Sequence, residues 1–222
     1  MTHLPRRSLL LGAAATATGL LLSACGSSGS ANSTGSTDSS VVQPSVQNNS
    51  PYKGVYLNRT FPKPDVTLTD TTGKPYELAQ RTAGKATLLY FGYTRCPDVC
   101  PTTMGDIAVA VSKLPKAQQQ QLQVVFVTTD PARDTPAQLR TWLAAFNTDF
   151  VGLTGDITTI IAAAKSVGVA VEAPVQGQEP VHGAQVLAYL PSDNKAHVLY
   201  TSGTSSADFA HDLPLLIKGV TG

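Results

Sequence analysis

The sequence predicts an α/β fold in which a central mixed β-sheet is flanked by helices and preceded by an added β-hairpin. Three observations predict it. Two continuous apolar runs, at residues 87–93 and 122–129, are typical of buried strands. Each run is followed by a segment whose apolar residues recur at helical spacing. Two further short strands and a final helix complete the alternation of strands and helices that is typical of α/β proteins.

Residues 1–24 carry the features of an export signal. They combine a basic start at Arg6 and Arg7, an apolar run, and a small-residue site that ends directly before Cys25. The apolar run is too short to span a bilayer, which takes about 20 apolar residues. The pattern resembles a bacterial lipoprotein signal, so we expect an acylated Cys25 that anchors an extracytoplasmic protein to the cell membrane. The paired arginines also resemble a twin-arginine signal, and the sequence leaves the export route open.

A flexible linker is expected at residues 25–50. Ser, Gly, Thr and Asn dominate this stretch, and its few apolar residues could not offset the entropy of ordering it. The folded domain is then residues 51–222, a length suited to a single core. Without Arg6 and Arg7 the chain keeps 14 basic residues against 15 acidic ones. This near-neutral balance gives no argument for binding nucleic acid.

The domain opens with a hairpin signal and then reaches a stretch that carries two cysteines. Apolar and polar residues alternate on both sides of the turn sequence Thr72-Gly73-Lys74, as in a β-hairpin. The apolar strand at 87–93 leads into Cys96 and Cys100. Pro101 follows at a position suited to the first turn of a helix, and apolar residues continue after it at helical spacing.

The rest of the domain alternates between strands and helices. After the apolar strand at 122–129, Thr135 and Pro136 have the residue types of an N-cap and a first helical position. The remaining elements are a helix that begins at Thr154 or Asp156 and ends at Gly168, strands at 186–190 and 196–201, and a last helix capped by Ser205. This order is that of the thioredoxin-like fold, to which the early hairpin and the helix after Asp156 are additions.

The cysteine pair indicates a chemical site. Two thiols one helical turn apart, at a helix start, face the same side, and the partial positive charge of a helix N-terminus favours the thiolate. With Cys25 assigned to lipid, Cys96 and Cys100 are the cysteines of the mature domain. In an oxidising compartment they could form a structural disulfide, but a bridge that closes so short a loop would stabilise the fold little.

A histidine occupies the position that faces the dithiol in this fold. Thioredoxin-type exchangers carry a cis-proline before the third sheet strand, where this chain has Val181-His182-Gly183-Ala184. Two soft sulfurs and one imidazole suit copper, because thiolates favour Cu(I) and imidazole helps to accept Cu(II). Structural zinc more often recruits four protein ligands. Parallel strands also place Asp130, which follows the strand at 122–129, at the same edge as the cysteines.

Other candidate ligands have ordinary structural interpretations. His3 is removed with the signal, His197 follows a turn on a strand, and His211 lies in the last helix. Met104 recurs at helical spacing with apolar neighbours and is interpreted as core. For Asp98, inside the cysteine loop, the sequence leaves helix capping, partner binding and no role open.

Four motifs in order carry a resemblance to a known family. The stretches FGYTRCPDVCPTTM, TTDPARDTPAQLRTW, FVGLTG and VHGAQVLAYL resemble the Sco/SenC family of copper-binding proteins that assist cytochrome c oxidase assembly, over the chain from about Phe61 to the C-terminus. The resemblance implies a thioredoxin-like fold, an outward-facing membrane anchor, and copper held by Cys96, Cys100 and His182. It also implies delivery of copper to the binuclear copper centre of oxidase subunit II or to another copper protein, or reduction of that subunit's cysteines.

The resemblance places Asp130, Arg133 and Asp134 in the family's D-P-x-R-D-T segment, beside the site. Helix capping and a local Arg–carboxylate pair explain these residues equally well. This chain departs from the family pattern directly before His182, where the family often has an acidic residue. Here that position is Val181, and Glu179 lies three residues before the histidine.

The leading hypothesis is a membrane-anchored extracytoplasmic copper metallochaperone. The alternative is a thiol–disulfide reductase, in which Cys96 would attack a partner's disulfide and Cys100 would resolve the mixed disulfide. A third hypothesis is a binding module with a structural disulfide. The cysteine pattern of a peroxidase is not matched.

Overall fold

The computed structural model describes residues 49–175 and 177–222. The predicted signal at 1–24, the predicted lipidation site Cys25 and nearly all of the predicted linker lie outside the described residues. Within the described residues, no helix combines the length and the apolar character that a bilayer crossing requires.

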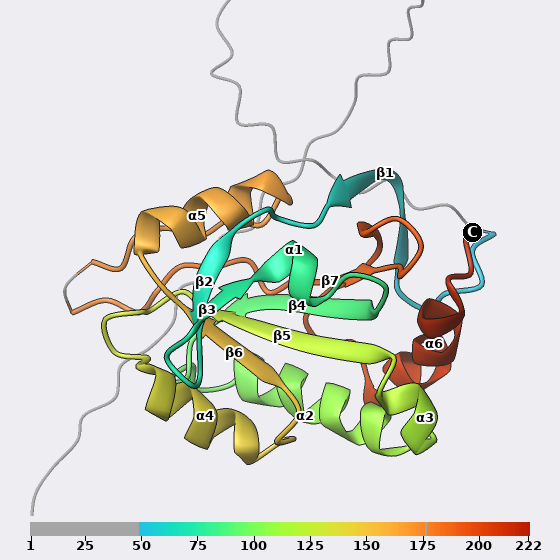
Figure 1. The fold of residues 1–222 in the computed structure, drawn as a ribbon, viewed down its shortest axis with the longest axis horizontal. Coiled ribbons are helices and arrows are strands. Elements are labelled where there is room, and N and C mark those ends of the chain that lie inside the picture. The colour runs from blue at the N-terminus through green and yellow to red at the C-terminus, as the bar shows by residue number, and fades with distance from the viewer. Residues whose placement is uncertain (1–48, 176) are drawn as a thin grey trace, which may run out of the picture. The chain divides into compact units, whose positions relative to one another are not determined.

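One eight-stranded mixed sheet forms the centre of the domain (Figure 1), in the strand order β1-β8-β7-β4-β5-β6-β2-β3. The strands are β1 Val55–Pro62, β2 Thr67–Asp70, β3 Pro75–Glu77, β4 Ala86–Gly92, β5 Leu122–Thr128, β6 Val151–Thr154, β7 Val186–Tyr189 and β8 Lys195–Tyr200. β4, β5 and β6 run parallel, and the other neighbours pair antiparallel. The predicted mixed sheet is therefore confirmed, as is the early hairpin, which is β2 and β3.

Helices cover both faces of the sheet. They are α1 Leu78–Arg81, α2 Val99–Ser112, α3 Lys116–Gln119, α4 Pro136–Ala144, α5 Ile157–Ser166 and α6 Ser206–Lys218. The alternation of side chains along β4 separates two core clusters. Leu88 and Tyr90 belong to a cluster with α2, α4 and α6, whereas Leu89 and Phe91 belong to one with α1 and α5. Figure 1 shows α5 on one side of the sheet and α2 with α4 on the other.

The predicted helix starts are confirmed by their capping contacts. Thr135 accepts a hydrogen bond from the Gln138 backbone N–H in a complete capping box, with Pro136 at the first helical position. Asp156, rather than Thr154, caps α5. The Ser205 hydroxyl accepts the backbone N–H of Asp208 at the start of α6. These local signals fix where each helix begins because they satisfy N–H groups that have no partner within the helix.

Two strands were not expected from the sequence. β1 is an edge strand, and its pairing with β8 shifts register between Tyr56 and Phe61, so its side chains lack a regular alternation. β6 is four residues long and contains Gly152, a residue type that is depleted in strands. A Cβ at Gly152 would lie 2.7 Å from a methyl carbon of Leu143 on α4, so glycine permits the helix to pack closely on this strand.

Lys63 is an unusual feature of the interior, because its side chain is buried at 5% exposure. Its ammonium group donates to the Thr82 carbonyl, the Thr87 hydroxyl and the Asn194 amide oxygen, and lies 5.3 Å from the centre of the Tyr189 ring. All four partners are neutral. Burial therefore lowers the pKa of Lys63 to about 8.

This lowered pKa predicts a pH-dependent contribution to stability. Between the folded pKa of about 8 and the ordinary value of 10.5, the unfolded state holds a proton that the folded state has lost. Stability conferred through Lys63 therefore rises with pH across this window, by at most about 1.4 kcal/mol per pH unit. Urea unfolding of wild type and Lys63→Met would be measured from pH 7 to 10.5. The unfolding free energy of wild type minus that of the variant should increase with pH. Groups common to both proteins cancel in this difference, and a constant difference would contradict the prediction.

Candidate metal centre

The two cysteines lie where β4 passes into α2. Cys96 lies in the connecting loop and is half-buried, whereas Cys100 lies in the first turn of α2 and is fully buried. Both are free thiols. The backbone N–H of Cys100 donates to the Cys96 sulfur at 3.3 Å, so the sulfur takes the place of a capping oxygen. Cys96 is therefore the more exposed of the two thiols.

The environment of Cys100 differs from the one predicted. A helix N-terminus was expected to favour its thiolate, but burial dominates and raises the pKa of Cys100 to about 12. The Tyr90 hydroxyl donates to the Cys100 sulfur at 3.5 Å, and a backbone hydrogen bond from Tyr93 also favours the thiolate. These contacts only partly offset the cost of removing the sulfur from water.

His182 reaches the cysteines from the segment between α5 and β7. This segment is held by a bridge that pairs Val171 with His182 and by a hydrogen bond from the Gly183 N–H to the Ala170 carbonyl at 2.7 Å. The Gly183 carbonyl lies 3.1 Å from Nδ1 of the imidazole. A carbonyl can only accept, so Nδ1 carries the proton and Nε2 keeps its lone pair.

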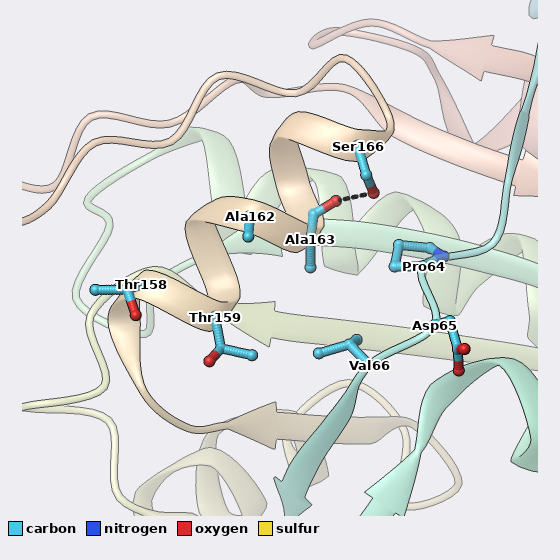
Figure 2. Close-up of a pocket in the computed structure, with 8 residues that line it drawn as sticks. All are labelled: Pro64, Asp65, Val66, Thr158, Thr159, Ala162, Ala163 and Ser166. Carbon is cyan, nitrogen blue, oxygen red and sulfur yellow. Dashed lines mark hydrogen bonds between the residues drawn. The ribbon is translucent and has the colours of Figure 1, made fainter.

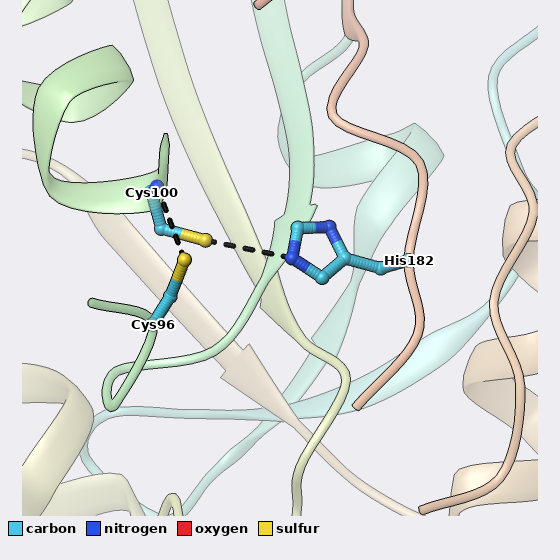
Figure 3. A group of neighbouring side chains, drawn as sticks. All are labelled: Cys96, Cys100 and His182. Carbon is cyan, nitrogen blue, oxygen red and sulfur yellow. Dashed lines mark hydrogen bonds between the residues drawn. The ribbon is translucent and has the colours of Figure 1, made fainter. Parts of the chain in front are cut away.

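The imidazole faces the buried thiol. Its Nε2 lies 3.6 Å from the Cys100 sulfur, and Figure 3 shows the ring directed at that sulfur from the side opposite the cysteine loop. The Tyr93 ring packs edge-on against it, with ring centres 5.5 Å apart. Burial lowers the pKa of His182, which favours the neutral imidazole that a metal ion requires.

The structure brings the three predicted ligands together. The donor atoms of Cys96, Cys100 and His182 lie within 4.8 Å of one another, and no other group of three such residues occurs in the part of the chain that the structure describes. Two sulfurs and one imidazole nitrogen fit a soft or borderline ion such as copper. They do not fit Mg²⁺ or Ca²⁺, which prefer oxygen ligands.

Asp134 holds the cysteine loop to the end of the neighbouring strand. Its carboxylate accepts the backbone N–H of Thr94 at 2.9 Å and the hydroxyl of Thr128 at 2.6 Å. It is fully buried and lies outside the group of three donors. Asp134 therefore positions the loop that carries Cys96.

Arg133 links the strand end to the segment that carries His182. Its guanidinium pairs with buried Asp130 and lies 3.6 Å from the Glu179 carboxylate, three residues before the histidine. A side-chain hydrogen bond joins Tyr93 to the same carboxylate. The predicted local Arg–carboxylate pair is present, and it extends to Glu179. This chain thus has an acidic contact near His182 although Val181 directly precedes it.

His197, His211 and Met104 take the structural positions predicted for them, whereas the sequence leaves the role of Asp98 open. His197 lies 2.9 Å from the Asp193 carboxylate, and His211 lies 2.7 Å from Asp212. Met104 is fully buried in the core. Asp98 occupies the N-cap position of α2, but its side chain makes no capping hydrogen bond.

Tyr90 and Tyr93 were predicted only as parts of an apolar strand, and their contacts to the site were not predicted. Their aromatic character indicated a buried strand correctly, but no spacing signal revealed that a hydroxyl or a ring would face a ligand.

A pocket of about 440 Å³ lies elsewhere in the domain, between the residues before β2 and helix α5 (Figure 2). It is lined by Pro64, Asp65, Val66, Thr158, Thr159, Ala162, Ala163 and Ser166. The Ser166 hydroxyl is already used, since it donates to the Ala163 carbonyl at 2.7 Å. None of the lining residues is a cysteine or a histidine, so this pocket is not part of the candidate metal site.

Comparison with protein families identifies the group to which the chain belongs. A family model described as SCO1/SenC matches residues 58–217, most of the chain. The chain belongs to the SCO1/SenC family. The resemblance predicted from the motifs is thereby confirmed.

Individual Sco proteins are similar in sequence and fold. Protein SCO1, mitochondrial, from Saccharomyces cerevisiae is 31% identical over 145 residues, 62% of this chain and 49% of that protein. The solution structure of apo Sco1 from Thermus thermophilus has a TM-score of 0.65 at 33% identity and covers 74% of this chain and 96% of that one. The copper-bound structure of Bradyrhizobium japonicum ScoI has a TM-score of 0.59 at 28% identity and covers 71% and 98%. The chain spans about half or less of the length of the curated relatives it matches. These likenesses confirm the thioredoxin-like fold.

Gly92 at the end of β4 allows the Cys100 sulfur to approach the strand. A Cβ at this position would lie 2.9 Å from that sulfur and 2.9 Å from a ring carbon of Phe126. Both neighbours are fully buried and cannot easily move away.

Gly92→Ala should therefore destabilise the reduced, metal-free protein by about 1–3 kcal/mol in urea unfolding and increase the reactivity of Cys100 towards a thiol reagent. Gly105→Ala is the control, because a Cβ there on α2 meets nothing within 4 Å and should leave stability unchanged or slightly raised. Equal stability of the Gly92 variant and wild type would show that the site tolerates the added methyl group.

Proposed function

We propose that this protein is an extracytoplasmic copper metallochaperone that binds one copper ion through Cys96, Cys100 and His182. The observation that carries the proposal is the convergence of these three donor atoms within 4.8 Å, from two segments that are far apart in the sequence. Copper is the cargo of such a protein. Copper-bound structures of related Sco proteins, including Bradyrhizobium japonicum ScoI, support this choice of ion.

The unequal exposure of the ligands suits transfer of a metal ion. Cys100 is fully buried and holds the inner side of the site, whereas Cys96 and His182 are half-buried and open to a partner. Thiolates and imidazoles of a partner could therefore replace Cys96 and His182 first and Cys100 last. Binding releases the thiol protons, and because burial raises the pKa of Cys100, loading of copper is favoured as pH rises.

We propose the binuclear copper centre of cytochrome c oxidase subunit II as the destination of the copper. The basis is membership of the SCO1/SenC family together with the resemblance of the four motifs. The proposed lipid on Cys25 and the linker at 25–50 would hold residues 51–222 at the outer face of the cell membrane with freedom to reach that partner.

A second candidate function is reduction of a partner's disulfide. It is favoured by the exposure of Cys96, which a partner could reach, and by the hydrogen bond from the Cys100 N–H, which holds the Cys96 sulfur beside Cys100. The Cys96 thiolate would attack the partner's disulfide and release one partner thiolate. Cys100, after losing its proton, would then displace the second, leaving a Cys96–Cys100 disulfide in this protein and two reduced thiols in the partner.

Replacement of His182 tests the copper site. His182→Ala should weaken Cu(II) binding by at least about tenfold, more than it weakens Cu(I) binding, because the two thiolates that Cu(I) prefers remain. Affinities would be measured anaerobically by competition with chelators specific for each oxidation state.

His197→Ala is the matched control, because this histidine pairs with Asp193 outside the group of three donors. Equal losses of Cu(I) and Cu(II) affinity in His182→Ala would contradict the proposed role of the imidazole. Reduction of a protein disulfide by metal-free protein, at a rate unaffected by chelator, would favour the reductase.

A further inference from the structure

Tyr90 contacts the proposed site from the centre of the sheet. It lies on β4, is fully buried, and its hydroxyl donates to the Cys100 sulfur at 3.5 Å. Its ring also packs edge-on against His182, with ring centres 6.3 Å apart. One side chain therefore touches two of the three donor residues while coordinating nothing itself.

A second hydroxyl fixes the direction of this hydrogen bond. The side chain of Thr103 on α2, buried at 7% exposure, hydrogen-bonds the Tyr90 hydroxyl. A phenol has one proton to donate, and the Cys100 sulfur, once it is a copper-bound thiolate, can only accept it. The proton of Tyr90 therefore lies on the sulfur side, and Thr103 donates to the Tyr90 oxygen. Neighbouring hydrogen bonds in such a chain strengthen one another in a water-free interior.

We propose that Tyr90 is a positioning residue that tunes the Cys100 sulfur towards Cu(I). This inference rests on the proposed copper site. A hydrogen bond to a ligand sulfur withdraws electron density from it and makes it a weaker donor, and the oxidised metal ion depends more on that donation. Tyr90 thus favours Cu(I) over Cu(II), in opposition to the imidazole of His182.

The hydrogen-bond donor of Tyr90 can be removed without disturbing the other contacts of the Cys100 sulfur. The backbone of Tyr93 also forms a hydrogen bond with the Cys100 sulfur, and a side-chain substitution at Tyr90 leaves that contact in place. The Tyr90 and Cys100 side chains are both inaccessible to solvent, so bulk water is not positioned to replace the missing hydroxyl. Tyr90→Phe keeps the ring against His182 and removes only the O–H.

The test compares the copper-loaded Tyr90→Phe variant with wild type. Its sulfur-to-copper charge-transfer band should move to lower energy, because the sulfur electrons are less tightly held. The ratio of Cu(I) to Cu(II) affinity, measured with chelators specific for each state, should fall about three- to tenfold, the scale of one hydrogen bond. Thr103→Val should change both readouts in the same direction by a smaller amount, because Tyr90 keeps its proton but loses its orientation.

Tyr189→Phe is the matched control. Tyr189 is a fully buried tyrosine on the adjacent strand β7, and its hydroxyl has no hydrogen-bond partner among the described residues. An unchanged band and affinity ratio in Tyr90→Phe, or an equal shift in Tyr189→Phe, would overturn the role of Tyr90. Sulfur-to-copper charge-transfer bands that are present in wild type and altered in His182→Ala would support the copper site independently of the role of Tyr90. Absence of the bands in wild type would overturn both the site and its tuning.

Discussion

The pairing of β4 with both of its neighbours is the constraint on which the site depends. β5 runs parallel to β4 in a level register, with Gly92 opposite Thr128, so the two strands end at one edge. β7 runs antiparallel, with Tyr90 opposite Val186, so the segment before β7 arrives at that same edge. The cysteine loop, the D-P-x-R-D-T segment and His182 therefore meet because of how three central strands pair. Strand pairing brings these segments together although they are far apart in the sequence.

Different polar contacts at this edge hold the cysteine loop and the segment that carries His182. Asp134 fastens the cysteine loop to the end of β5 through buried hydrogen bonds. Arg133 and Tyr93 hold Glu179, and with it the segment that carries His182, through contacts that are more exposed. Exposed ion pairs contribute little stability. The histidine segment is also held by the backbone pairing of His182 with Val171 and of Gly183 with Ala170. Buried side-chain contacts thus fix the cysteine side of the site, and backbone pairing fixes the histidine side.

Sequence patterns predicted the parts of this architecture that local chemistry determines. The apolar runs gave β4 and β5, and the caps at Thr135 and Ser205 gave two helix starts. The order of elements then placed His182 opposite the cysteines. The edge strand β1 and the short strand β6 escaped prediction because irregular pairing and Gly152 remove the alternation on which such predictions depend. The hydrogen bond of Tyr90 escaped as well, because an aromatic residue in a buried strand has the same pattern whether or not its hydroxyl has a partner.

X-ray absorption at the copper edge, on the reduced protein loaded anaerobically with one equivalent of copper, tests the central claim most directly. A copper ion held by Cys96, Cys100 and His182 should give a single copper environment with two sulfur ligands and one imidazole nitrogen, and the imidazole signal should be lost in His182→Ala. Copper surrounded only by nitrogen or oxygen, with Cys96 and Cys100 joined in a disulfide, would contradict it. That result would mean that the protein works through its thiols alone.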